Sequence, residues 1–265
     1  MIEAAARAAQ EEFDSDAARV ESLLTFLESF RSYAAQRDPE PELVENSERS
    51  AAGRLWSQAS EVRTDLPVLA GSLLLYLCGR FENFVRELAG SVVEDLVDST
   101  AKYVDLPPAL KKEHLSRVLA INQSPGRYGY DPDAAAALAV EWAHGFSSGD
   151  SGFSVTPDVI TITESNMNPG TLTDVLKRVG VGEVWETLGK QASVKLHLSE
   201  VRDGDCTRMA KIKLEALMKE RNKIAHPTKD TEFPDAGYVR SAAEYFRVLA
   251  KELLNIVLVL RAAAN

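Results

Sequence analysis

The segment PVLAGSLLLYLCGRFENFVRELAGSVVEDLVDSTAKYV (Pro67–Val104) carries apolar residues at helical spacing on more than one face. A helix at a protein surface shows one apolar stripe, whereas a helix that is apolar on several sides is buried among other elements. We therefore expect this segment to form the central helix of the core. Pro107 and Pro108 end the pattern, because proline cannot continue a helix in its interior.

Helical patterns lie on both sides of this central segment. Residues 3–36 predict one long amphipathic helix, and the polar, proline-containing residues 37–48 connect it to a second pattern that begins near Glu48. Toward the C terminus, further helices are expected at residues 107–122, 133–146, 171–180 and 205–226, and from residue 236 onward.

One part of the chain suggests a different structure. Residues 147–170 are rich in Gly, Ser, Asn and Pro and contain the β-branched run Val159–Thr163, which predicts one short strand or hairpin. Thr171 and Asp174 resemble an N-cap pair for the helix that follows. The predicted fold class is therefore mainly α, a helical bundle with at most a short β-hairpin.

The composition is that of a soluble globular protein. The chain has 265 residues, 45% of them hydrophobic and 26% charged, which allows one large domain or two smaller ones. The longest apolar runs fall short of a membrane span and the acidic N-terminal residues do not resemble a signal peptide, so we expect no membrane association. Cys78 and Cys206 are the only cysteines, which fits a reducing cytoplasm and excludes a cysteine-built zinc site.

The net charge of −10 argues against nucleic acid, but the charge is unevenly distributed. Residues 1–65 hold seven arginines against fourteen acidic residues, whereas residues 202–229 hold eight basic against four acidic residues. A local basic segment is compatible with a phosphate-bearing substrate even on an acidic protein. Solvation of an amphipathic helix explains the same charges equally well.

The segment ERNKIAHP (Glu220–Pro227) lies in this basic region. Leu214, Leu217 and Met218 form an apolar stripe that Arg221 continues, so the guanidinium is expected at a place where an unpaired charge is costly. Such a cation requires a carboxylate, a phosphate or a solvent-filled cleft.

Asn222 and His226 share the adjoining face, and Pro227 ends the helix immediately after His226. An imidazole can transfer a proton near neutral pH, and a guanidinium can hold two phosphate oxygens. The alternative is structural, with Arg221 paired to an acidic neighbour and His226 capping the carbonyls of its own helix end.

The string RNKIAHP at the end of one helix and before another resembles the signature of the HEPN superfamily, and YLCGRFENFVREL (Tyr76–Leu88) resembles the first core helix of its RiboL-PSP branch. The similarity covers residues from about 65 to 260. It divides the chain into an acidic N-terminal helical extension (1–64) and a HEPN-like helical domain (65–265).

The resemblance implies a homodimer in which two copies of the motif face one composite active site. It also implies a metal-independent endoribonuclease without cofactor, acting as a toxin or phage-defence effector. His226 would activate the RNA 2′-hydroxyl or protonate the leaving oxygen, Arg221 would stabilise charge on the phosphate, and Asn222 would orient either group. The products would carry a 2′,3′-cyclic phosphate and a 5′-hydroxyl.

Two further residues are candidates. Lys223 could contact a substrate phosphate, although a solvated lysine explains it as well, and Glu82 could be a carboxylate that orients Arg221 or His226, although a surface glutamate is the commoner case. No residues stand at metal-ligand spacing, so no metal is expected. Related toxins that are silenced by nucleotidylation carry a tyrosine two residues after the histidine, where this chain has Thr228. We therefore expect no antitoxin of the nucleotidyltransferase kind.

Two other functions remain open from the sequence. The protein could be a non-catalytic HEPN module in a defence complex, with the Arg–His pair holding RNA or a protein and the acidic N-terminal helices docking a regulatory partner. It could also be a helical adaptor in which the Arg–His pair is an internal, ion-paired cap.

Overall fold

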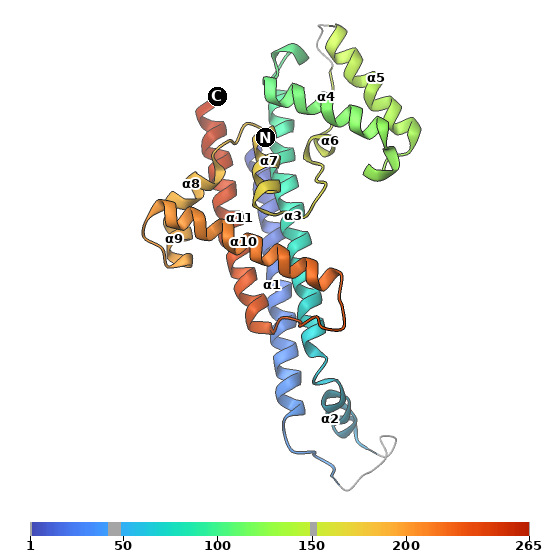
Figure 1. The fold of residues 1–265 in the computed structure, drawn as a ribbon, viewed down its shortest axis with the longest axis vertical. Helices are drawn as coiled ribbons and strands as arrows, with labels where there is room; N and C mark the ends of the chain where they lie inside the picture. The colour runs from blue at the N-terminus through green and yellow to red at the C-terminus, as the bar shows by residue number, and fades with distance from the viewer. Residues whose placement is uncertain (1, 42–48, 149–152, 265) are drawn as a thin grey trace. The chain divides into compact units, whose positions relative to one another are not determined.

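The computed structural model describes residues 2–41, 49–148 and 153–264. These residues form α-helices joined by turns and two short 3₁₀ segments, and no strand is found among them (Figure 1). The expectation of a mainly α fold is confirmed. The elements are α1 (Ile2–Ala34), α2 (Ala51–Val62), α3 (Leu66–Asp98), η1 (Tyr103–Asp105), α4 (Pro108–Gln123), η2 (Pro125–Tyr128), α5 (Pro132–Ser148), α6 (Pro157–Thr161), α7 (Pro169–Arg178), α8 (Val184–Lys190), α9 (Ala192–Leu198), α10 (Asp203–Ala225) and α11 (Ala236–Ala264).

The predicted β element at Val159–Thr163 is wrong. Pro157 stands in the first turn of a helix there, and the short helix α6 ends at Thr161. Val159 and Ile160 are buried, and Arg178 Nη1 donates to the carbonyl oxygens of Ile160 (2.9 Å) and Ile162 (2.7 Å). These tertiary contacts satisfy the backbone without a strand partner, so they override the β propensity of the run.

The start of α7 also differs from the prediction. The helix begins at Pro169 rather than after Thr171, and Asn168 Oδ1 accepts the backbone N–H of Thr171 at 3.0 Å. Asparagine is a strong N-cap residue and proline is favoured in the first turn, so this pair replaces the expected Thr171–Asp174 cap. The short helices α8 and α9 were not predicted.

Contacts within the chain divide it into two compact units. The larger unit comprises residues 1–13, 81–218 and 248–265, and the smaller unit comprises residues 14–80 and 219–247. Helices α1, α3, α10 and α11 each contribute residues to both. The predicted boundary between residues 64 and 65 remains a prediction.

The larger unit has an aromatic and aliphatic core around the second part of α3. Phe13 of α1 contacts Phe81 and Phe84 of α3, with ring centroids 5.9 and 5.7 Å apart, and all three side chains are buried. Arg261 of α11 donates two hydrogen bonds to Asp95 of α3, at 3.0 and 2.6 Å. The expectation of a central, buried α3 segment is met here.

A satellite core lies under α4, α5 and α6 of the larger unit. Four buried residues form it, and six partly buried hydrophobic residues pack against them. The buried members are Val118, Ile121, Ala135 and Val159, and the others are Tyr128, Tyr130, Leu138, Ala139, Trp142 and Ile162.

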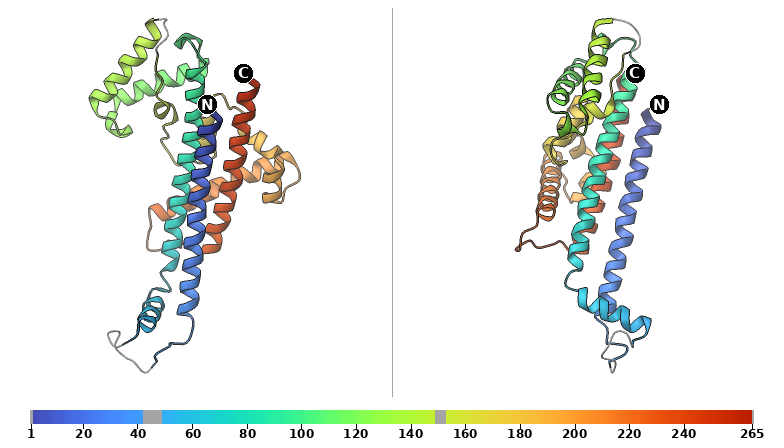
Figure 2. Two further views of the ribbon diagram at one scale, coloured as in Figure 1. Left: turned by 180° about the vertical axis from the view of Figure 1, so that it is seen from behind. Right: turned by 90° about the vertical axis from the view of Figure 1, so that its right-hand side faces the viewer.

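In the smaller unit, the first part of α3 runs beside α1 (Figure 2). The buried carboxylate of Asp16 on α1 accepts hydrogen bonds from Tyr76 Oη (2.5 Å) and Arg80 on α3 and from Arg19 Nη1 (2.5 Å). Burial alone would raise the pKa of Asp16, but the bonds from Tyr76 and Arg80 and the charges of Arg80 and Arg19 lower it. The carboxylate therefore stays ionised and joins the two helices.

Helices α2 and α11 are held to α1 in the same unit. Tyr33 Oη and Trp56 Nε1 bond to backbone carbonyls across the α1–α2 junction, at 2.9 and 3.1 Å. Arg240 of α11 pairs with Glu21 and Glu28 of α1. The hydrogen bonds that Arg240 donates to the carboxylates of Glu28 and Glu21 raise the pKa of Arg240, which therefore keeps its charge.

Within the described part of the chain, α3 is also the one helix long and apolar enough, by length and composition alone, to cross a bilayer. Of its most apolar window, 44% is buried inside the protein. Since a core helix passes the same test, this is weak evidence for a membrane span.

We predict that Gly189→Ala destabilises the larger unit by about 1–3 kcal/mol, because overpacking a tight contact carries a cost of this size. A Cβ at Gly189 would stand 2.0 Å from Thr207 Oγ1 and 2.7 Å from the carbonyl oxygen of Asp203 on α10. Urea unfolding followed by far-UV circular dichroism measures the effect. Gly182→Ala is the matched control, since nothing lies within 4 Å of its Cβ position; equal midpoints for the two variants would contradict the close approach.

We also predict acid sensitivity from His114. Burial lowers its pKa from 6.5 to about 4, and its Nδ1 lies 3.3 Å from the hydroxyl of Tyr103. Because the folded protein disfavours the charged ring, the contribution to stability is present above pH 6.5 and is lost as the pH falls from there toward 4. The free energy of unfolding should drop by roughly 2 kcal/mol between pH 7 and pH 5 from this residue.

Urea unfolding at the two pH values measures this loss. His114→Gln is neutral at every pH and should lose less stability on acidification than the wild type. Parallel pH profiles for the two proteins would show that His114 is not the source.

Candidate functional site

Four of the five sequence-predicted site residues lie at the C-terminal end of α10, in the smaller unit: Arg221, Asn222, Lys223 and His226. The helix ends at Ala225, and the last helical bond runs from the His226 N–H to the Asn222 carbonyl oxygen at 3.2 Å. The stop before Pro227 follows from proline chemistry, as expected from the sequence. We call Arg221, Asn222 and His226 the Arg–His motif: Arg221 and Asn222 lie near the end of α10, and His226 is the first residue after it.

This helix end is anchored on α3. Ile224, between the polar residues of the motif, is 5% exposed. A Cβ built on Gly71 of α3 would stand 3.4 Å from Ile224 Cγ2 and 2.7 Å from Phe233 Cδ1. Because Gly71 has no side chain, the end of α10 and the α10–α11 connection can pack directly against α3 at this position.

The chain that leaves the motif is also held locally. Thr231 N donates to the carbonyl oxygen of Thr228 at 3.1 Å, and Thr231 Oγ1 accepts the N–H of Thr228 at 2.7 Å. Asp235 Oδ1 then accepts the N–H of Tyr238 at 2.8 Å and caps α11. The motif is therefore fixed before and after His226.

The functional groups of the motif face solvent to different degrees. Arg221 is half-buried, and its Nη1 donates to Asn222 Oδ1 at 3.1 Å. No carboxylate of the described residues forms an ion pair with Arg221, so the acidic partner required by the structural alternative is not found there. His226 is exposed, and its ring has no hydrogen-bond partner within the same described ranges.

The other two candidate residues have partners of their own. Lys223 Nζ lies 3.0 Å from Glu220 Oε2, in an i,i+3 pair with 67% of the lysine side chain exposed. Such a surface pair is weak and leaves the lysine free to exchange partners. Glu82 belongs to the larger unit, where its carboxylate accepts a hydrogen bond from Thr163 Oγ1 at 2.6 Å. Its role as an orienting carboxylate remains a prediction.

Tyr238 lies within the electrostatic reach of Glu220, the residue before Arg221, and the sequence did not single it out as functional. Partial burial is the main cause that raises the pKa of Tyr238, and electrostatic interactions with Glu220 and Cys78 raise it further. Its hydroxyl therefore remains a hydrogen-bond donor at neutral pH. Its only distinguishing feature in the sequence is its position three residues after Asp235, the α11 cap; otherwise the pattern assigns it to the apolar stripe of that helix.

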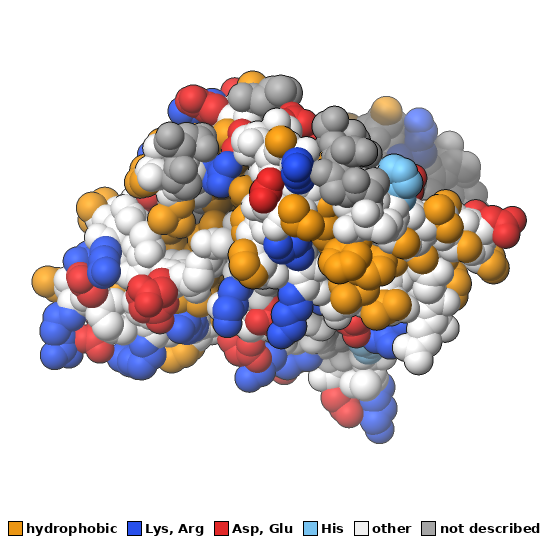
Figure 3. Space-filling view, turned by 90° about the horizontal axis from the view of Figure 1, so that it is seen from above, with side chains coloured by type: hydrophobic (Ala, Val, Ile, Leu, Met, Phe, Trp, Pro, Cys, Tyr) orange, Lys and Arg blue, Asp and Glu red, His pale blue; other side chains and the backbone are white. Residues whose placement is uncertain are grey.

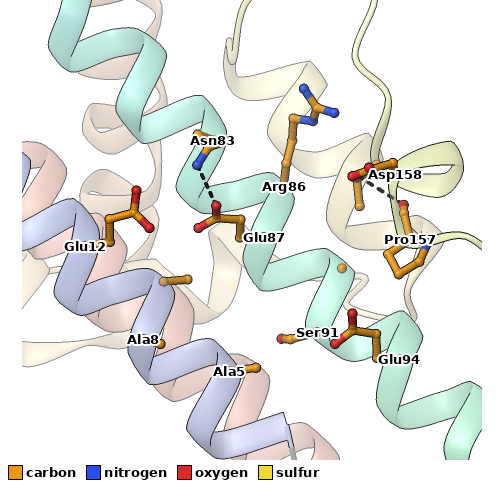
Figure 4. Close-up of a pocket in the computed structure, with 13 residues that line it drawn as sticks. Ala5, Ala8, Glu12, Asn83, Arg86, Glu87, Ser91, Glu94, Pro157 and Asp158 are labelled. Atoms are coloured by element: carbon orange, nitrogen blue, oxygen red, sulfur yellow. Dashed lines mark hydrogen bonds between the residues drawn. The ribbon is translucent and has the colours of Figure 1, made fainter. Parts of the chain in front are cut away.

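A cavity of about 440 Å³ in the larger unit differs in character from the motif (Figure 4). Among the residues that line it are four carboxylates and one arginine, from α1, α3 and α6: Glu12, Glu87, Glu94, Asp158 and Arg86. The excess of negative charge repels a phosphodiester chain. The cavity is therefore a poor site for nucleic acid.

The described residues also contain no group of three or more His, Cys, Asp or Glu side chains arranged to hold a metal ion. The acidic residues of the cavity do not converge in that way.

A comparison with protein families identifies one match. The family model described as RiboL-PSP-HEPN matches residues 53–258, which include α3 and the Arg–His motif. No curated protein and no solved structure matches the chain. HEPN domains serve in general as ribonucleases or RNA-binding modules. Since the match covers well over half of the chain, the protein belongs to the RiboL-PSP-HEPN family.

Proposed function

We propose that the protein is a metal-independent endoribonuclease that cleaves RNA through attack of a 2′-hydroxyl, with Arg221, Asn222 and His226 as its catalytic residues. The observation that carries the proposal is the combination of a half-buried Arg221 without an acidic partner among the described residues and an exposed imidazole one turn later. Such a guanidinium is complementary to a phosphate, which supplies the missing negative charge.

The reaction needs a base, an acid and a stabiliser of negative charge. An imidazole of His226 removes the proton of the 2′-hydroxyl, whose oxygen attacks the adjacent phosphorus. The bond from phosphorus to the 5′-oxygen breaks, and an imidazolium returns a proton to that oxygen. The fork of Arg221 holds the phosphate oxygens while charge develops on them. The products are a 2′,3′-cyclic phosphate and a 5′-hydroxyl.

Asn222 positions the guanidinium in this scheme. Its Oδ1 accepts a hydrogen bond from Arg221 Nη1, which limits the rotation of the fork without neutralising its charge. A carboxylate in the same place would compete with the phosphate. The pairing of arginine with a neutral amide therefore supports an anionic substrate over a structural ion pair.

We extend the proposal to a homodimer in which two copies of the motif line one groove. One chain offers a single imidazole at this helix end, whereas the reaction uses both a base and an acid. Two subunits supply two imidazoles, so that each can take one role. RNA cleavage in the cytoplasm by such a dimer would suit a toxin or a phage-defence effector, restrained by a partner protein that docks on the acidic N-terminal helices.

We predict that His226→Ala lowers the RNA cleavage rate by at least about 100-fold, the contribution typical of general acid–base catalysis. The assay uses purified protein, single-stranded RNA and EDTA, and the product ends are identified by mass spectrometry. His226 is exposed, so the thermal unfolding midpoint should not change. Cleavage by the alanine variant at the wild-type rate would refute the assignment, and binding of RNA without cleavage by any form would favour a non-catalytic module.

Arg221→Lys tests the role of the guanidinium. The charge is kept but the planar fork is lost, so we expect a decrease of about 10-fold or more in the cleavage rate. Lys219→Gln is a control for loss of a positive charge on the same helix end, where the side chain is exposed. If the two variants cleave RNA equally well, Arg221 does not act through its geometry.

A further inference from the structure

Large apolar side chains are exposed at several places on the surface, and on the face shown in Figure 3 they gather near lysine and arginine side chains. One such group lines an open hollow of about 360 Å³ in the larger unit. The hollow is formed by η1, α4 and α5, and its lining residues are Tyr103, Val104, Lys111, Lys112, Leu115, Trp142 and Phe146. We call it the Trp142 hollow.

Two aromatic side chains of the hollow form a stacked pair, which we call the aromatic platform. Trp142 and Phe146, one turn apart on α5, are stacked with ring centroids 5.5 Å apart and an angle of 16° between their planes. Phe146 is 59% exposed. A nearly parallel aromatic pair with an exposed outer ring offers a face on which another planar ring can stack.

The Trp142 ring of the platform is fixed by a hydrogen bond to a buried residue. Trp142 Nε1 donates to the hydroxyl of the buried Tyr103 at 3.0 Å, and Tyr103 in turn contacts His114 at 3.3 Å and the edge of Phe153. The indole N–H is therefore satisfied inside the protein, and the rings need no reordering before a ligand stacks on them.

The charge of the hollow is positive. Lys111 and Lys112 of α4 are the charged residues among those that line it, and none of the lining residues is acidic. Lys111 Nζ is fixed by a hydrogen bond to the carbonyl oxygen of Val104, and Lys112 is exposed. The hollow differs in this from the cavity between α1, α3 and α6 of the same unit, which is lined mainly by carboxylates.

We propose that the Trp142 hollow binds single-stranded RNA, with a base stacked on Trp142 and Phe146 and the adjoining phosphates near Lys111 and Lys112. Stacking on aromatic rings beside cationic side chains is the usual way in which proteins hold single strands. A duplex keeps its bases stacked inside and cannot use the platform. The site deepens the proposed function, on which its choice of ligand rests, by giving the substrate a point of attachment in addition to the Arg–His motif.

The test measures RNA binding apart from cleavage. Full-length His226→Ala protein is titrated into a fluorescein-labelled single-stranded RNA in EDTA, and fluorescence anisotropy gives the dissociation constant. Adding Phe146→Ala should weaken binding about fivefold or more, because stacking of one base is worth about 1–3 kcal/mol. Phe26→Ala is the matched control, since Phe26 is a similarly exposed phenylalanine (62%) on α1 in the smaller unit.

The lysines are tested by salt dependence. Lys112→Gln should weaken binding and lower the slope of log affinity against log salt by about 0.7, the value for one phosphate contact in a single strand. Lys177→Gln, an exposed lysine on α7, should leave the slope unchanged. A duplex of the same sequence should bind with an affinity that does not depend on Phe146.

Unchanged affinity in both Phe146→Ala and Lys112→Gln would overturn the proposal. A change in self-association with RNA affinity intact would also overturn it and would assign the hollow to a protein partner. The proposed function fails separately: loss of binding in Phe146→Ala, with no cleavage by wild type, keeps the hollow and removes the nuclease. If the wild type cleaves RNA but binding does not depend on Phe146, the nuclease proposal stands and the RNA site in the hollow is refuted.

Discussion

The close approach of α10 to α3 at Gly71 is the constraint on which the Arg–His motif depends. Ile224 is buried at this contact, Arg221 on the same side of the helix is half-buried, and Asn222 on the other side is exposed. Because an α-helix turns by 3.6 residues, one buried position fixes the direction of every residue around it. The anchoring of an apolar residue thus determines where a guanidinium and an imidazole meet the solvent.

The arginines of the smaller unit differ in whether they pair with a carboxylate. Arg240 is bound to two glutamates and Arg80 to the buried Asp16, so their charges hold helices together. Arg221 has an amide as its neighbour and keeps its charge available. A cation that is half-buried without a carboxylate among the described residues has a cost in stability that a structural role does not explain. In the proposed function, a bound phosphate of the RNA substrate offsets that cost.

Much of the fold could be predicted from the sequence because the long helices have strong periodicity. The central helix was visible in Pro67–Val104, and the end of α10 followed from Pro227. The short helices could not be predicted in the same way. The run Val159–Thr163 has high β propensity, yet its first three residues are helical and Arg178 binds the carbonyl oxygens of Ile160 and Ile162. For such short segments, tertiary contacts decide the structure and local propensity does not.

The candidate site could be predicted only in part. The residues of the motif were visible as a pattern, whereas their anchoring was not, since nothing in the sequence connects Gly71 with Phe233 more than 160 positions later. The aromatic platform on α5 was likewise hidden, because Trp142 and Phe146 read as ordinary apolar positions of an amphipathic helix. Their exposure and the lysines of α4 beside them emerge only in three dimensions.

The distance between the motifs of two subunits tests the account most directly. Cys78 and Cys206 are both buried, so a spin label attached through Lys229→Cys, three residues after His226, is placed on an exposed site. Double electron–electron resonance of the labelled, RNA-cleaving protein should give one narrow, short distance across the shared groove. A distance beyond the range of dipolar coupling, or a monomer that cleaves RNA as fast as the assembled protein, would contradict a composite active site.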